Sequence, residues 1–154
     1  MTKPRKISIA ITLVLVALAA AFLMPWGTGG RSRADYTNPE LVAQGKEIYQ
    51  QYCASCHGRE LEGQPDWRTR GPSGALPAPP HDESGHTWHH PDQLLFEMTK
   101  YGVKPFAPAD WVSDMPAFNG VLSDEQIWAV LAYIKSRWPE RMREYQQQRN
   151  AAAK

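Results

Sequence analysis

Residues 53–57 read Cys-Ala-Ser-Cys-His, and this short motif restricts the possible folds more than any other feature of the chain. C-x-x-C-H is the attachment pattern of c-type haem, in which two thiols bond one porphyrin and the adjacent imidazole ligates its iron. A thioredoxin-type redox pair needs a βαβ context that the sequence lacks, and a zinc site needs further ligands. We therefore expect one covalent haem c, anchored by Cys53 and Cys56 and ligated by His57.

The segment before the motif predicts a helix that runs directly into Cys53. Asn38 can cap its first turn, and Pro39 suits the first helical position. Apolar or small residues then recur at helical spacing and form one stripe: Leu41, Val42, Gly45, Ile48, Tyr49 and Tyr52.

Two further helices are expected, and no stretch alternates as a strand would. The clearer one follows Ser123, which can form a capping box with Gln126, and stops near Pro139. Its apolar residues at 3–4-residue intervals are Ile127, Val130, Leu131, Ile134 and Trp138. A shorter helix spans residues 91–101, with Leu94, Leu95 and Met98 on one side, and Gly102 ends it. The fold class is therefore mostly α.

The rest of the chain is expected to be irregular. Most of its 13 prolines and 11 glycines lie between residues 63 and 120, which predicts a loop-rich middle. The polar tail, residues 139–154, is expected to be frayed helix or disorder. Three helices give a modest core for a domain of this size, so a bound group should supplement it.

The N-terminus is expected to target the chain to a membrane. Residues 7–24 carry no charge and follow Lys3, Arg5 and Lys6. As a helix this run is about 27 Å long, close to the ~30 Å of a bilayer core. We interpret residues 1–26 as an inner-membrane anchor and residues 27–37 as a linker. A cleaved signal stays open, because residues 17–21 offer small-x-small cleavage spacing.

The distribution of charge indicates where residues 34–154 are located and which partners they can have. The basic N-terminal flank predicts that residues 34–154 are periplasmic, either tethered to the membrane or, after cleavage, soluble. These residues contain 12 basic and 16 acidic side chains, a formal charge of −4, so a basic footprint for nucleic acid is missing. Expected partners are redox donor and acceptor proteins of the same membrane or periplasm, and the membrane itself.

Whether the haem iron has a sixth protein ligand separates an electron carrier, in which the position is filled, from a protein that binds small molecules or catalyses a reaction there. Met115 is the best candidate, since it lies in a loop before the last helix that Pro116 and Gly120 close. The alternative is that Met115 only fills a gap in the core. Met98 falls on an apolar helical stripe and fits core packing better.

Residues 38–138 resemble the bacterial class I monohaem cytochromes c, in a membrane-anchored form. The resemblance rests on the helix running into the CASCH motif, the Pro/Gly-rich middle, the Met115-Pro116 dipeptide and the last helix, Ile127-Trp-Ala-Val-Leu-Ala-Tyr-Ile134. It implies a small helical domain around one haem that carries single electrons and is not an enzyme. It also implies His57 and Met115 as axial ligands.

The resemblance implies three further contacts. The first and last helices should cross, with Gly45 and Tyr49 against Val130 and Tyr133. A proline carbonyl should accept a hydrogen bond from the His57 ring, and four prolines compete: Pro72, Pro77, Pro79 and Pro80. Trp88 and Trp111 resemble indole donors to a haem propionate, although both also fit simple packing against the haem.

Four histidines gather within ten residues, at positions 81, 86, 89 and 90. The interpretation that we favour is a solvated polar loop; a copper or zinc site, or a histidine in place of Met115, are the alternatives. Two functional alternatives therefore stay open beside the electron carrier. One is a haem subunit of a redox enzyme, and the other is a metal-responsive haem protein that uses His81–His90.

Overall fold

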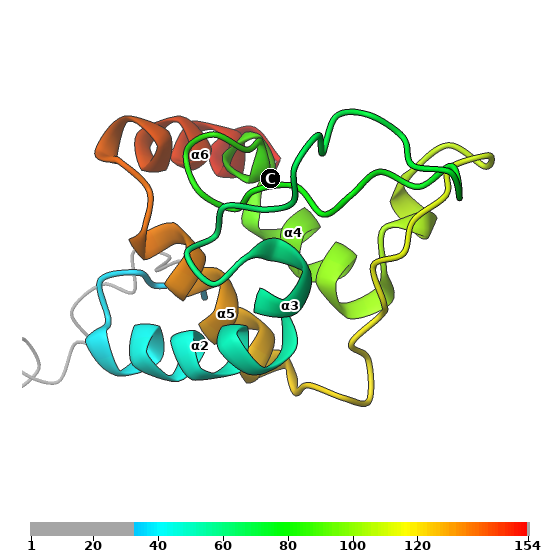
Figure 1. Cartoon of the computed structure of the whole chain (residues 1–154). Helices are drawn as coiled ribbons and strands as arrows, with labels where there is room; N and C mark the ends of the chain where they lie inside the picture. Colours follow the sequence, from blue (N-terminus) through cyan, green and yellow to red (C-terminus); the bar gives the residue numbers. More distant parts are fainter. Residues whose placement is uncertain (1–32, 154) are drawn as a thin grey trace, which may run out of the picture. The chain divides into compact units, whose positions relative to one another are not determined.

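A computed structural model describes residues 33–153, which form a mostly helical domain (Figure 1). Its elements in chain order are α2 (Pro39–Tyr52), α3 (Ala54–His57), the 3₁₀ turn η1 (Thr87–His89), α4 (Asp92–Tyr101), the 3₁₀ turn η2 (Lys104–Phe106), α5 (Asp124–Ser136) and α6 (Glu140–Ala152). Within residues 33–153 there is no strand, and a single isolated bridge joins Asn119 to Leu122. The mostly-α prediction is confirmed for this part of the chain.

The expected membrane segment, residues 1–26, and residues 27–32 of the expected linker lie outside the described residues. Among the residues that are described, no helix combines the length and the apolar character needed to cross a bilayer.

Helix α2 begins where the sequence predicts and continues almost without a break into the motif. Asn38 caps it, since its Oδ1 accepts hydrogen bonds from the backbone N–H groups of Glu40 and Leu41 at 3.0 and 3.2 Å. At the other end the N–H of Cys53 donates to Tyr49 O at 2.9 Å, and the N–H of His57 donates to Cys53 O at 2.9 Å. This continuity fixes the direction in which α3 leaves α2.

Helix α5 starts with the predicted capping box and ends earlier than predicted. The Ser123 hydroxyl and the Gln126 side chain each bond the other residue's backbone N–H. The helix ends at Ser136, so Trp138 belongs to the connection that follows it. Trp138 is nevertheless buried, and its Nε1 donates to the carbonyl oxygen of His81 at 2.7 Å. That hydrogen bond fastens the loop after α3 to the end of α5.

Helices α2 and α5 cross in close contact, as the family resemblance implies (Figure 1). A methyl group on Gly45 would overlap the carbonyl oxygen of Ala129 and would lie 3.0 Å from Tyr133 Cβ. One turn further along α2, the rings of Tyr49 and Tyr133 lie 5.4 Å apart. The closest approach is thus to Ala129, next to the Val130 that was expected, and it requires glycine at position 45.

Helix α4 matches the predicted span of 91–101 to within one residue, and Gly102 ends it at φ +81°. Its buried face includes Phe96, whereas Met98 is only partly buried. At its start, both carboxylate oxygens of Asp92 lie 2.7 Å from Nζ of Lys135 in α5. This buried ion pair ties α4 to the end of α5.

The expectation of a frayed or disordered tail is wrong, because residues 140–152 form helix α6 against the loop around η1 (Figure 1). Gln146 is only 1% exposed, and its Nε2 donates to His90 O at 3.2 Å. Arg149 Nε donates to His89 O at 3.2 Å, and the ring of Tyr145 packs 5.4 Å from that of Trp88. Polar side chains bonded to backbone carbonyls hold this helix, so its low hydrophobicity did not signal disorder.

Candidate functional site

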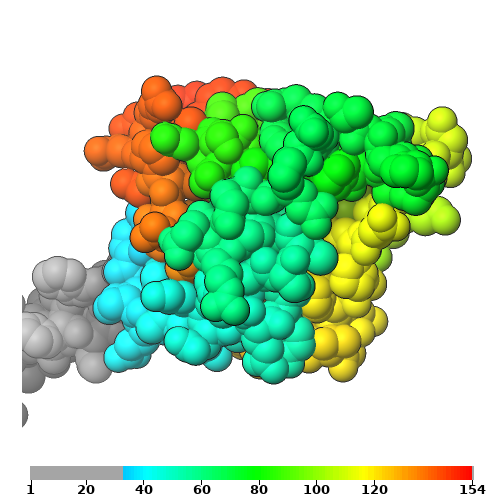
Figure 2. Space-filling view, viewed as in Figure 1, coloured from blue at the N-terminus to red at the C-terminus, as the bar shows by residue number. Residues whose placement is uncertain are grey.

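The motif consists of Cys53, which joins the end of α2 to α3, and of the single turn of α3. Cys53 is partly buried, Cys56 is exposed, and both are free thiols. Burial, reinforced by the nearby Cys56, raises the pKa of the Cys53 thiol to about 12. Gly58 ends the turn at φ +82°, and the chain then leaves as the long loop that covers much of the face shown in Figure 2.

The His57 side chain is 8% exposed, and its ring has a defined partner. Nδ1 lies 2.8 Å from the carbonyl oxygen of Pro79, so of the four prolines that the sequence left open the structure brings Pro79 to the imidazole. Burial lowers the pKa of His57, and the bond to Pro79 works against that shift without reversing it. The ring is therefore a neutral imidazole in which Nδ1–H donates to Pro79 and Nε2 keeps a lone pair suited to a metal.

The backbone around His57 is also held by hydrogen bonds. The Tyr49 hydroxyl donates to His57 O at 3.3 Å and to Gly58 O at 3.0 Å, and the N–H of Gly63 donates to His57 O at 2.8 Å. Burial raises the pKa of Tyr49, so its phenol stays protonated and remains a donor. Helix α2 and the following loop thus fix the position of the motif's histidine from both sides.

His81 departs from the favoured interpretation of the histidine cluster as a solvated loop. Its ring stacks on the ring of His57, with centroids 4.0 Å apart and planes 21° apart, and its Nδ1 lies 2.8 Å from Thr87 Oγ1. Burial holds the pKa of His81 well below its usual range. Two imidazoles that ligate one metal from opposite sides aim nitrogens at it and cannot stack face to face. His81 therefore does not serve as the ligand opposite His57.

The other three histidines lie nearer the surface. His86 is exposed and stacks on Trp67 at 5.4 Å, while the His90 ring lies 5.5 Å from that of His86. The His89 ring packs 3.9 Å from that of Trp88. Across residues 33–153, no three or more His, Cys, Asp or Glu side chains are grouped so that they could hold a metal ion.

Met115 and Trp88 contact the same apolar cluster as the motif residue Cys53. Both are partly buried and pack, as Cys53 does, against the main apolar cluster of the domain. Within the described part of the chain, the buried Nε1 of Trp88 has no hydrogen-bond partner; the same holds for Trp128, whose ring stacks on Phe96 at 4.4 Å. Trp111 instead lies under the guanidinium of Arg70, 4.7 Å from its ring centre.

These residues fit a c-type haem. Two free thiols on one helical turn can form its two thioethers, and a neutral imidazole with its Nδ1 already bonded can ligate iron through Nε2. The Met115 thioether, which packs against the same cluster, is of the soft kind that could ligate iron, and the unpaired indole N–H of Trp88 suits an acidic group of the porphyrin.

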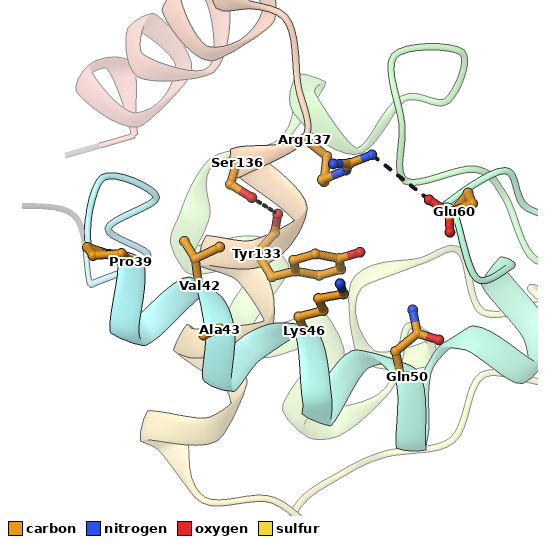
Figure 3. Close-up of a pocket in the computed structure, with 9 residues that line it drawn as sticks. All are labelled: Pro39, Val42, Ala43, Lys46, Gln50, Glu60, Tyr133, Ser136 and Arg137. Atoms are coloured by element: carbon orange, nitrogen blue, oxygen red, sulfur yellow. Dashed lines mark hydrogen bonds and ion pairs between the residues drawn. The ribbon is translucent and has the colours of Figure 1, made fainter.

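A surface hollow of about 300 Å³ lies elsewhere, between α2 and α5 (Figure 3). Lys46 and Tyr133 line it, and Arg137 reaches Glu60 across its rim at 3.9 Å. None of the motif residues line this hollow, so the expected haem chemistry does not use it.

Comparison with known families agrees with this assignment. The family model described as cytochrome c oxidase, cbb3-type, subunit III matches residues 40–134, more than half of the chain. The comparison with curated proteins gave no match. The matched segment runs from the first turn of α2 to two residues before the end of α5, and it includes the CASCH motif, His81 and Met115. The chain carries a covalently bound c-type haem for electron transfer, and it belongs to the cytochrome c family as a class I monohaem-type domain.

Proposed function

We propose that this protein carries single electrons on one haem that Cys53 and Cys56 anchor and that His57 and Met115 ligate. The observation that carries the proposal is the hydrogen bond from His57 Nδ1 to Pro79 O, because it leaves Nε2 of a motif histidine free for iron. When bound, the haem supplies the one-electron exchange between ferric and ferrous iron. The chain contributes the anchors, the ligands and a largely apolar surrounding.

The two thiols have matching roles in attachment. On a haem, each thiol would add its S–H across one vinyl group, so that a C–S bond would form and the hydrogen would go to the neighbouring carbon. No oxidant is required, but both thiols must be reduced when the haem is attached. Cys53 and Cys56 lie one helical turn apart, since the N–H of Cys56 donates to Cys53 O at 3.1 Å.

Met115 is supported as the second axial ligand by its place on the same cluster as Cys53 and Trp88. The N–H of Met115 donates to Ser113 Oγ at 3.2 Å, which helps to order the loop that carries it. A thioether ligand favours the reduced iron and raises the reduction potential.

Replacing Met115 tests this assignment. We expect Met115→Ala to lower the reduction potential and to let the ferrous protein bind carbon monoxide. Met98→Ala is the matched control, because Met98 is also partly buried but lies on α4, and it should change neither property. An unchanged optical spectrum and no carbon monoxide binding in Met115→Ala would reject Met115 as a ligand. Carbon monoxide binding by the unaltered protein would instead favour a redox-enzyme subunit.

We further propose that the domain works in the periplasm, tethered to the inner membrane by residues 1–26. The support is the uncharged run at 7–24 with its basic flank. A tether raises the effective concentration of redox partners in the same membrane. Fractionation tests this: the haem should sediment with membranes and be accessible to protease from the periplasmic side. Recovery of all the haem in a soluble periplasmic extract would show a cleaved signal, and recovery in the cytosol would contradict both versions.

A further inference from the structure

We propose that His81 is a positioning residue for His57, one that covers a face of the ligand imidazole, fixes its plane and shields its Nδ1 proton from water. The inference rests on the proposed role of His57 as an iron ligand. It concerns a residue that the histidine pattern alone favoured as solvated loop.

The contact between the two rings carries the inference. Their centroids are 4.0 Å apart with planes only 21° apart, which is a face-to-face stack and not an incidental edge contact. The hydrogen bond to Pro79 holds the His57 ring at one point on its edge, which alone would allow the ring to tilt. A flat group against its face removes that freedom.

His81 is itself held on several sides. Its Nδ1 is bonded to Thr87 Oγ1 at 2.8 Å, its N–H donates to Leu61 O at 2.8 Å, and its carbonyl oxygen accepts from Trp138 Nε1 at 2.7 Å. Thr87 and Trp138 are both buried. The centroids of the Tyr49 and His81 rings are 6.2 Å apart, with the two planes at 71°.

Two nearby residues of the same loop therefore hold the His57 imidazole. Pro79 accepts from its edge, and His81, two residues later, covers its face. Because outer contacts that orient a ligand also set its strength, this arrangement should affect the reduction potential as well as the ring. The other histidines of the loop cannot do this: the His86 ring stacks on Trp67 and the His89 ring packs on Trp88.

The test is hydrogen exchange of the His57 Nδ1 proton, followed by NMR in the reduced holoprotein. We expect this proton to exchange about tenfold faster in His81→Ala, because the local cover is gone. In His81→Phe a flat ring is kept although the hydrogen bond to Thr87 is lost, so exchange should be clearly slower than in His81→Ala. His89→Ala, which removes a histidine that packs on Trp88, should have no effect. The reduction potential should shift in His81→Ala more than in His81→Phe.

A general loss of stability is separated from this local effect by a reference proton. The backbone N–H of Ala129, at the crossing of α2 and α5, reports opening of the whole domain, so each rate is compared with that of Ala129. Thr87→Val provides a second variant, since it removes the partner of His81 Nδ1 and keeps the size of the side chain; it too should speed exchange of the His57 proton.

The possible outcomes are distinct. If His57 exchange, relative to Ala129, and the reduction potential are unchanged in both His81→Ala and Thr87→Val, His81 is not a positioning residue. If His81→Ala yields no holoprotein, Thr87→Val decides alone. Failure of the proposed function shows separately, as wild-type protein without a haem absorption band, and it overturns this inference as well.

Discussion

The Nδ1 atom of His57 lies 2.8 Å from the carbonyl oxygen of Pro79, a residue 22 positions further along the chain. This hydrogen bond links the helical turn of the motif to the far end of the loop that follows it. It selects the tautomer in which Nε2 is unprotonated, which is the form that binds a metal. The loop between the two residues thus sets the tautomer of His57.

Gly63 should be required for the hydrogen bond between His57 and Pro79. It has φ +69°, and a methyl group there would overlap the backbone nitrogen of Pro80 and lie 2.7 Å from the carbonyl carbon of Pro79. We expect Gly63→Ala to lower the free energy of unfolding by about 1–3 kcal/mol and to shift the reduction potential. Denaturant titration and redox titration measure the two effects.

Gly74→Ala is the control for Gly63→Ala. Gly74 has a similar φ of +83°, but a methyl group there would meet only Val112 Cγ2 at 3.8 Å. It should show the cost of backbone strain without a shift in potential. Equal potentials in the two variants would mean that Gly63 does not position Pro79.

Gln146 should stabilise the fold although it lies in a polar helix. Its buried Nε2 donates to His90 O, and removal leaves that carbonyl without this donor. We expect Gln146→Ala to cost about 1–3 kcal/mol, measured by chemical denaturation of the holoprotein. The neighbouring Gln147 is exposed, so Gln147→Ala should cost less than about 0.5 kcal/mol. Similar stabilities of the two variants would show that α6 is not fastened through Gln146.

The parts of the fold that could be predicted depend on local chemistry. Asn38 and Ser123 cap helices through bonds within their own first turns, so three or four residues of sequence suffice to identify them. The helix of residues 140–152 could not be predicted in this way, because its stability depends on carbonyl groups of residues 89 and 90. Those carbonyl groups come close to Gln146 and Arg149 only once the chain has folded.

The same distinction applies to the site. The haem motif is contiguous, so Cys53, Cys56 and His57 can be identified from sequence; their individual roles stay predictions, as does that of Met115. The choice of Pro79 among four prolines needed the path of the loop. The stack of His81 on His57 had no signal in residue spacing, since it depends on Thr87 and Trp138 holding the loop in place.

Acid should destabilise the domain partly through His86 and His90. Partial desolvation of the ring is the main cause that lowers the pKa of each histidine below 6.5, although the His86 residue as a whole is exposed. Nearby positive charge adds to the shift, from His90, His89 and Arg68 for His86, and from His89 and Arg149 for His90. At pH values between the lowered pKa of the folded protein and the unfolded pKa of 6.5, the unfolded chain binds more protons than the folded one. Their contribution to stability is therefore complete above the unfolded pKa of 6.5 and is lost as the pH falls through the lower folded pKa.

Thermal melts at about pH 7.5 and about pH 5 test this effect. The double variant His86→Gln/His90→Gln should lose less of its Tm between the two pH values than the wild type does. If both proteins lose the same amount, the acid sensitivity comes from other groups.

Mass spectrometry of the peptide that contains residues 53–57, after acid denaturation and proteolysis, shows whether the haem is bonded to this chain. We expect this peptide to carry one haem, and acidified organic solvent to leave the colour with the polypeptide. A peptide with two unmodified cysteines, or colour that passes entirely into the solvent, would contradict it.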